Sequence, residues 1–228
     1  MVMFDLLPIS PIKLSLEKAQ VKIGEHLILN DISASFTTPE ITVITGPNGA
    51  GKSTFLSALA GLLPLSKGTR HLTEADGQDA AITRLGYVLQ KPVMFRRSVR
   101  DNLAIAMKAA GTRHHHGFQD QILTKMGLEG LLDKSAFQLS QGERQRLAVA
   151  RVLLMQPGVM MLDEATNSLD QASITILERE VRALADAGMP VLWVTHSRAQ
   201  AERLADRVIA MEEGKIISDT SAATFFSA

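Results

Sequence analysis

Two stretches near the start of the chain alternate apolar and polar residues, and this period of two predicts β-strands. They cover residues 12–21 and 27–36, with Gly24 marking a turn between them. Residues 41–45 form a short β-branched run that ends at Gly46, which is typical of a strand buried on both faces. We therefore expect an antiparallel pair of strands, followed by a central strand of a second sheet.

After Gly46 the pattern changes repeatedly between helical and strand spacing. The predicted elements are a helix over 52–63 that stops before Pro64, a strand over 85–89, a helix over 141–155, a strand over 159–162, a helix over 171–187, a strand over 191–195, a helix over 198–205, and a hairpin over 208–211 and 215–218. This order predicts an α/β fold with a mostly parallel sheet and an N-terminal antiparallel β flank.

Helical spacing also fills the stretch from about residue 97 to residue 138, where no clear strand pattern interrupts it. Apolar positions at helical spacing there include Val99, Leu103, Ala106, Ile122, Leu123 and Met126. We predict a helical subdomain over about residues 97–156, inserted in a single domain that spans residues 1–228. A chain of 228 residues is long enough to bury a sizeable core.

The composition limits the classes of protein that this chain fits. Lys plus Arg and Asp plus Glu both number 24, so the basic excess typical of nucleic-acid binders is missing. The chain has no cysteine, which excludes disulfides and thiol chemistry. Residues 1–10 carry Asp5 and no basic cluster, so we expect no signal peptide, and no apolar run approaches the ~18–20 residues that span a bilayer. Any membrane role is therefore expected to depend on partner subunits.

A glycine-rich loop joins the predicted strand 41–45 to the helix that follows, and it fits the pattern G-x-x-x-x-G-K-[ST]. The loop comprises Gly46, Pro47, Asn48, Gly49, Ala50, Gly51, Lys52, Ser53 and Thr54. Glycines let the backbone curl so that N–H groups point at phosphate oxygens, and the helix presents its positive end to the same anion. We expect Lys52 to reach the β- and γ-phosphates of a nucleotide and Ser53 to bind Mg²⁺.

The apolar strand 159–162 delivers two carboxylates, Asp163 and Glu164, to its C-terminal end, where α/β sheets bind ligands. Because phosphoryl transfer needs positioning and charge stabilisation above all, we expect Asp163 to hold Mg²⁺ and Glu164 to orient the attacking water. An acidic strand end that caps the next helix is the simpler alternative, and the phosphate loop argues against it.

Four further features follow a fixed order with these two. They are Gln90, the turn Leu139-Ser140-Gln141-Gly142-Glu143, the segment Ser168-Leu169-Asp170, and His196. Taken one at a time, Gln90 is a strand-end amide, Ser140 with Glu143 a capping box, and His196 a structural histidine. Taken in order with the phosphate loop, the set resembles the ATP-binding subunit of ABC transporters over about residues 12–220. The resemblance implies a P-loop NTPase core with ATP and Mg²⁺ as cofactors.

The resemblance also implies roles for individual residues. Gln90 opens a loop that touches Mg²⁺ and the attacking water and that faces the membrane subunit. Ser140 and Gly142 face the γ-phosphate of ATP held by a second copy, so the active form is a homodimer. Asp170 lies in a segment that crosses the dimer interface, and His196 contacts the γ-phosphate.

The chain departs from the family pattern at several positions. Gln141 stands where glycine is commonest, and Ala165 stands where proline often follows the glutamate; we expect little effect from either. Many members stack an aromatic ring on adenine, but the matching position here is Ile23. Because an aliphatic contact gives up a stacking energy of about 1–3 kcal/mol per base, we predict weak base selectivity.

The run His114-His115-His116 has two interpretations. It is either a solvated loop between Gly111 and Gly117 or a metal-sensing tract. Consecutive residues point in different directions on a helix, which suits chelation poorly and favours the loop.

The resemblance implies transmembrane permease subunits as partners, with a periplasmic binding protein if the system is an importer, no nucleic acid, and a location at the cytoplasmic face of the inner membrane. The sequence of residues 90–103 is similar to that of oxyanion importers of the tungstate, molybdate and phosphate type. Since the sequence ends at Ala228, soon after its last predicted strand, we expect no C-terminal regulatory domain, as is typical of the tungstate group. Residues 191–196 also look like a group of metal-exporter ATPases, so an exporter stays an alternative. A soluble ABC ATPase lacks support, because no coiled-coil insertion or second copy of the domain is present. An inactive scaffold is disfavoured by Glu164 and His196.

Overall fold

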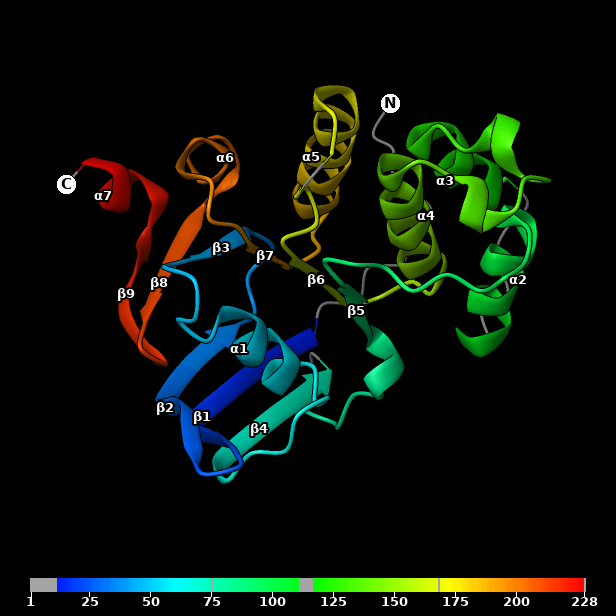
Figure 1. Ribbon diagram of the computed structural model, residues 1–228. Coiled ribbons are helices and arrows are strands. Elements are labelled where there is room, and N and C mark those ends of the chain that lie inside the picture. Colours follow the sequence, from blue (N-terminus) through cyan, green and yellow to red (C-terminus); the bar gives the residue numbers. More distant parts are fainter. Residues whose placement is uncertain (1–11, 75, 111–116, 168, 228) are drawn as a thin grey trace.

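The computed structural model describes residues 12–74, 76–110, 117–167 and 169–227, and its elements form two sheets and a group of helices (Figure 1). The strands are β1 (Ile12–Ile23), β2 (His26–Phe36), β3 (Ile41–Thr45), β4 (Lys67–Glu74), β5 (Leu85–Val88), β6 (Val159–Asp163), β7 (Val191–Val194), β8 (Arg207–Glu212) and β9 (Lys215–Ser221). The α-helices are α1 (Lys52–Leu59), α2 (Val99–Ala110), α3 (Phe118–Met126), α4 (Gln141–Leu154), α5 (Gln171–Asp186), α6 (Arg198–Leu204) and α7 (Ala222–Ser227). Short 3₁₀ turns cover Ile82–Arg84, Glu129–Leu131 and Ala136–Gln138.

The first sheet is antiparallel, with the strand order β2-β1-β4. β1 and β2 form the predicted hairpin, in which Ile23 pairs with His26 across the turn at Gly24. β4 joins the other side of β1, where Leu72 pairs with Leu14. The sequence did not predict β4, because Leu72 is its one buried side chain and the strand therefore lacks a clear apolar alternation.

The second sheet has the order β5-β6-β7-β3-β8-β9. The first five strands are parallel, and β9 pairs with β8 in an antiparallel hairpin. β3 lies at the centre, where Val43 pairs with Trp193 of β7 on one side and with Val208 of β8 on the other. The predicted fold class is therefore confirmed: an α/β fold with a mostly parallel sheet and an N-terminal antiparallel flank.

Both faces of the parallel sheet are covered. Met160 and Leu162 of β6 pack into the apolar cluster that contains helices α2 to α5, whereas Met161 between them packs into a second cluster with α1 and the antiparallel sheet. Because neighbouring residues of a strand point to opposite faces, an uninterrupted apolar run is what such a strand requires. Trp193 is fully buried in the first cluster, as predicted for a core residue.

Helices α2, α3 and α4 lie within the stretch 97–156 that was predicted to be helical, and they group at one end of the parallel sheet (Figure 1). One helix boundary differs from its prediction, and one helix was missed. Helix α1 ends at Leu59 rather than at residue 63, because the amides of Gly61 and Leu62 bond to Ala58 and Ser57 in a turn. The short helix α7 was not predicted. Among the described helices, none combines the length and apolar character that crossing a membrane requires.

Candidate functional site

The strand order brings the predicted chemistry to one edge of the parallel sheet. β5, β6, β7 and β3 lie side by side and run in the same direction, so their carboxyl ends meet at that edge (Figure 1). Gln90 comes shortly after β5, Asp163 ends β6, His196 follows β7, and the phosphate loop follows β3. Ligands of open α/β sheets bind at this edge, and here it gathers residues from positions 46 to 196 of the chain.

The phosphate loop leaves β3 through Gly46, whose φ of 144° is in a region that glycine alone occupies readily. A Cβ at Gly46 would collide with the carbonyl oxygen of Met211 in β8 and would lie 3.1 Å from the carbonyl carbon. The tips of the loop at Pro47, Asn48 and Gly49 are exposed. The loop therefore emerges beside β8 and turns its backbone toward solvent before α1 begins.

Lys52, the first residue of α1, is buried to 6% exposure, and its ammonium group lies under the loop. Its Nζ donates hydrogen bonds to the carbonyl oxygens of Gly46 and Pro47, each at 2.8 Å. Among the described residues, no carboxylate lies within ion-pair distance of this ammonium group. A buried cation that only carbonyl oxygens hold is poised to attract an anion, which fits the phosphates of a nucleotide.

Ser53 and Asp163 meet beside Lys52. The hydroxyl of Ser53 donates to Asp163 Oδ1 at 3.0 Å, and the hydroxyl of Tyr87 in β5 approaches Oδ2 at 3.4 Å. Burial raises the pKa of Asp163, and the hydrogen bond from Ser53 opposes the rise; burial also raises the pKa of Tyr87 to about 12. A hydroxyl beside a desolvated carboxylate matches the oxygen ligands of Mg²⁺, and a bound cation would favour the ionised carboxylate.

Glu164 directly follows β6 with a φ of 46°, so the chain turns left-handed at this carboxylate. Its Oε2 accepts hydrogen bonds from the side-chain amides of Gln90, at 2.9 Å, and of Asn167. Nδ1 of His196 lies 3.8 Å from Oε1. The structure thus brings together Gln90, Glu164 and His196, which the sequence singled out. The Glu164 carboxylate has neighbours at both of its oxygens.

The turn that contains Ser140 lies on the helical part of the chain. Ser140 caps α4: its Oγ accepts from the amide of Glu143 at 3.2 Å, and the Glu143 carboxylate accepts from the Ser140 amide at 2.7 Å. Ser140 is exposed, whereas Gly142 is buried against the start of α5. Among the described residues, no hydrogen bond joins this turn to the phosphate loop.

Two residues of the site were missed by the sequence analysis. Asn167 bonds to Glu164, and its backbone amide closes a turn onto the Glu164 carbonyl oxygen at 3.1 Å. The one sequence feature that could have indicated Asn167 is its position three residues after Glu164. Tyr87 reaches Asp163 because β5 pairs with β6, a neighbour relation that the order along the chain does not reveal.

Three other features singled out by the sequence are Ile23, the histidine run and the segment Ser168-Leu169-Asp170. Ile23 is exposed to 53% at the end of β1, so its side chain has room to meet a ligand. The histidine run 114–116 and Ser168 lie outside the described residues. Leu169 and Asp170 are described, and Asp170 caps α5 by accepting from the amide of Ser173 at 2.7 Å.

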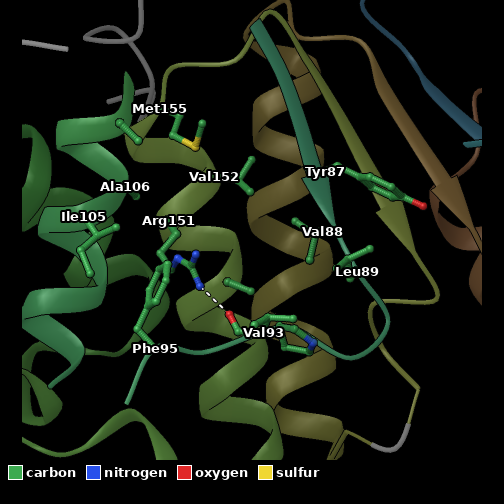
Figure 2. Close-up of a pocket in the computed structure, with 13 residues that line it drawn as sticks. Tyr87, Val88, Leu89, Val93, Phe95, Ile105, Ala106, Arg151, Val152 and Met155 are labelled. Atoms are coloured by element: carbon green, nitrogen blue, oxygen red, sulfur yellow. Dashed lines mark hydrogen bonds between the residues drawn. The ribbon is translucent and has the colours of Figure 1, made fainter. Parts of the chain in front are cut away.

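A groove of about 300 Å³ opens beside the segment that follows Gln90 (Figure 2). Its lining is mostly apolar and comes from β5, α2, α4 and residues 89–95. Arg151 of α4 crosses the groove, donates to the carbonyl oxygen of Val93 at 2.7 Å and lies over the ring of Phe95 at 5.2 Å (Figure 2). Val93 itself is 71% exposed, and Phe95 is 42% exposed. The segment after Gln90 therefore presents apolar surface next to the sheet edge where Gln90 and Glu164 meet.

Comparisons with known proteins agree with this geometry. The family model described as ABC transporter matches residues 29–167. A Fe(3+) ions import ATP-binding protein of Streptomyces coelicolor is 38% identical over 212 residues, which cover 90% of this chain and 61% of that protein. A molybdenum import ATP-binding protein of Rhodopseudomonas palustris is 38% identical over 202 residues, 82% of this chain and 52% of its own length. The chain thus spans between half and two thirds of the length of these two relatives.

One relative matches over most of both lengths. The glutamate/aspartate import ATP-binding protein of Escherichia coli is 33% identical over 213 residues, which cover 89% of this chain and 88% of that protein. Among solved structures, cbiO1 of Clostridium perfringens, a part of the ABC transporter complex cbiONQ, superimposes with a TM-score of 0.78 at 27% identity, covering 94% of this chain and 90% of its own. The chain therefore belongs to the ABC transporter family, whose ATP-binding domains are ATPases that drive transport.

Proposed function

We propose that this chain is the ATP-hydrolysing subunit of a membrane importer. The observation that carries the proposal is the convergence of Lys52, Asp163 and Glu164 at one sheet edge, each held in place by hydrogen bonds. A phosphate-binding loop alone would support nucleotide binding. A carboxylate fixed beside the loop supports hydrolysis as well, because phosphoryl transfer depends on positioning and charge stabilisation.

The residues of the loop and its surroundings suit ATP with Mg²⁺. The backbone of Gly46 to Thr54 would surround the phosphates, and Lys52 would place its positive charge beside them. Ser53, Asp163 and Gln90 would hold Mg²⁺, which supplies charge neutralisation to the phosphate oxygens when it is bound. Ile23 would cover the adenine base from its exposed position on β1.

Glu164 would orient the attacking water and accept its proton. The side-chain amides of Gln90 and Asn167 both donate to one oxygen of this carboxylate, which fixes the plane of the group. The second oxygen faces His196 at 3.8 Å. His196 would help to hold this arrangement and contact the γ-phosphate, as the family resemblance implies.

A complete site would need two copies of the chain. Ser140 and Gly142 open α4, and a helix N-terminus is suited to an anion. Within the described part of the chain, their recorded hydrogen bonds and close approaches involve α4 and α5. We propose that they act on ATP held by a second copy, so that ATP joins two copies and hydrolysis releases them.

The groove beside Gln90 would receive a short segment of a membrane permease. Its apolar lining and the exposed side chains of Val93 and Phe95 offer a surface that such a segment can cover. Arg96 and Arg97 directly follow Phe95, which lines the groove, and they would meet polar groups of the permease. The chain would then act at the cytoplasmic face of the inner membrane, with a periplasmic binding protein delivering the cargo.

An oxyanion of the tungstate or molybdate type is the proposed cargo. The proposal rests on residues 90–103 and on the similarity to the molybdenum import protein. Relatives named for Fe(3+) ions and for glutamate/aspartate have comparable identity, so the cargo needs its own test. That test is uptake of molybdate and tungstate by cells expressing the chain with the permease encoded beside it, against uptake of iron and glutamate.

Hydrolysis is tested on the purified chain with ATP and Mg²⁺. We expect steady-state turnover in the wild type and a loss of at least about 100-fold in Glu164→Gln, because the amide cannot accept a proton from water. Glu212→Gln, on the exposed end of β8, is the matched control and should keep wild-type turnover. Equal turnover in both variants would contradict the assigned role of Glu164.

A further inference from the structure

Gly142 and Arg146 lie one turn apart on α4, so they present the same face of that helix. This face meets the first turn of α5. Ser173, the third residue of α5, is the shared neighbour, and its side chain is 2% exposed. The contact lies between two segments that we assign to the dimer interface, namely the turn before α4 and the segment before α5.

Gly142 is needed here for space. A Cβ at this position would collide with Oγ of Ser173 and lie 3.1 Å from its Cβ. Gly142 is helical and has no positive φ, so backbone conformation does not require a glycine. The missing side chain lets α4 approach α5 closely enough for Ser173 to fill the gap.

Arg146 fastens the same contact with hydrogen bonds. Its Nη1 donates to Ser173 Oγ at 2.6 Å, and its Nε donates to the carbonyl oxygen of Met126 at 2.8 Å. Met126 is the last residue of α3, where unpaired carbonyl groups favour a cation. One guanidinium group therefore ties α4 to both α3 and α5.

Ser173 carries the connection on to Asp170. The amide of Ser173 donates to Asp170 Oδ1 at 2.7 Å, which caps α5. This hydrogen bond lowers the pKa of Asp170, and the charge of Arg146 acts in the same direction. A continuous chain of contacts therefore runs from α3 through Arg146 and Ser173 to Asp170.

We propose that Gly142, Arg146 and Ser173 form an intramolecular clamp that holds the Ser140 turn and the Asp170 segment in one fixed arrangement. Both surfaces would then reach a second copy of the chain as a single unit. Arg146 and Ser173 are positioning residues, because neither touches the phosphate loop of its own chain through a described hydrogen bond. Gly142 holds this contact in addition to the contact with the second copy's ATP that we propose for it. The inference rests on the proposed function, since it concerns how the shared ATP site is built.

In this proposal, Gly142 lets α4 pack against Ser173 of the same chain, a role separate from any contact of its backbone with a phosphate. If Gly142 served only to bring its backbone amide near a phosphate, then removing Ser173 would not compensate for an alanine there. If the clamp is the reason for the glycine, then room made at Ser173 should accommodate the added methyl group.

The experiment is a double-mutant cycle with Gly142→Ala, Ser173→Gly and the double variant, measured as kcat and KM for ATP. We expect Gly142→Ala to lower kcat by about tenfold or more, because small displacements of a reacting group are costly. The double variant should recover to the level of Ser173→Gly alone. A double variant as slow as Gly142→Ala, or slower, would overturn the clamp.

Two controls isolate the clamp from general loss of structure. Gly130→Ala adds a methyl group in open space, and Ala172→Gly weakens the first turn of α5 without making room beside Gly142. Gly130→Ala should not lower kcat as Gly142→Ala does, and Ala172→Gly should not restore the kcat of Gly142→Ala. Thermal unfolding of each variant checks the fold. A wild type without ATP hydrolysis would refute the proposed function, whereas an active wild type without rescue would refute only the clamp.

A second readout follows assembly. In a Glu164→Gln background, we expect Gly142→Ala to raise the ATP concentration needed for dimer formation while ATP binding to the monomer stays unchanged. Adding Ser173→Gly to Gly142→Ala should bring that concentration to the value of Ser173→Gly alone, which should lie between those of the Glu164→Gln parent and Gly142→Ala because the hydrogen bond from Arg146 is lost. Unchanged dimer formation in Gly142→Ala would contradict a role in positioning the shared surface.

Discussion

At the scale of single residues, the site depends on side chains that restrain one another. Glu164 has a left-handed backbone, and its carboxylate is fixed by two amide donors. Asp163 is desolvated beside the hydroxyl groups of Ser53 and Tyr87. These contacts place the two carboxylates to which we assign water orientation and cation binding next to each other, with separate partners for each.

Asn167 is expected to contribute to turnover through Glu164. In Asn167→Ala one donor to the carboxylate is lost, so the group samples more orientations and water is positioned less well. We predict a kcat lower by about 5- to 50-fold with a nearly unchanged KM for ATP. Steady-state kinetics measure both values. A raised KM at constant kcat would indicate that Asn167 binds nucleotide instead.

Glu143 should make stability depend on pH. Its hydrogen bond from the Ser140 amide lowers its pKa below the ordinary value of 4.5. A lowered folded-state pKa stabilises the fold above the unfolded pKa, and this contribution is lost as pH falls through the folded value. We predict that wild type exceeds Glu143→Gln in thermal stability at pH 7 and that the difference narrows below pH 4.5. A constant difference across that range would contradict the capping role.

Ile23 should give weak discrimination between bases. It is exposed and aliphatic, so it buries a purine without the stacking energy that an aromatic ring supplies. We predict ATP and GTP turnover within about tenfold of each other, and a stronger preference for one base in Ile23→Tyr. ATP turnover that exceeds GTP turnover by far more than tenfold in the wild type would contradict this prediction.

At the scale of elements, the parallel sheet converts order along the chain into a site. The candidate site lies at one edge of this sheet because β5, β6, β7 and β3 are neighbours, with β3 placed last in this series although it comes first in sequence. Short apolar runs predicted these strands, but they did not predict which strands are neighbours in the sheet. Tyr87 was therefore missed, since its contact with Asp163 depends on β5 lying next to β6.

The elements that the sequence did not predict share a physical cause. β4 and α7 are largely solvated, so neither shows the strong apolar period that reveals a buried strand or helix. Ser173 also looked unremarkable in sequence, because its role comes from the close approach of α4. Buried elements were predictable from local patterns, whereas contacts between elements required the fold.

Arg207 should contribute to stability without affecting the site. It donates to both oxygens of Asp219 at 2.6 Å and to the Ser35 carbonyl at 2.9 Å, which ties the β8–β9 hairpin to β2. The ammonium group of lysine cannot donate the same pair of hydrogen bonds to both oxygens of Asp219, so Arg207→Lys should lower the free energy of unfolding by about 1–2 kcal/mol. Denaturant unfolding measures the loss.

Arg100→Lys provides the matched control for Arg207. Arg100 pairs with Asp133 in an exposed position, where ion pairs contribute little to stability. We expect a smaller loss than in Arg207→Lys. Equal losses in the two variants, or weakened ATP binding in Arg207→Lys, would contradict this account of the hairpin.

At the scale of the whole molecule, the two groups of residues that we propose as half-sites lie in separate places. The phosphate loop, Asp163 and Glu164 lie at the edge of the parallel sheet, and the Ser140 turn lies on the helices. The family resemblance assigns these two places to opposite copies of the chain, and this assignment stays a prediction. The sequence could not indicate the close contact between Gly142 and Ser173, on which the proposed clamp rests.

The central claim, that two copies complete one ATP site, is tested most directly by the mass of Glu164→Gln in solution. With ATP and Mg²⁺, analytical ultracentrifugation should detect a dimer, because ATP is bound and not hydrolysed. Adding Ser140→Arg to that variant should leave a monomer that still binds ATP. A Glu164→Gln protein that binds ATP and stays monomeric at every protein concentration would contradict the shared site.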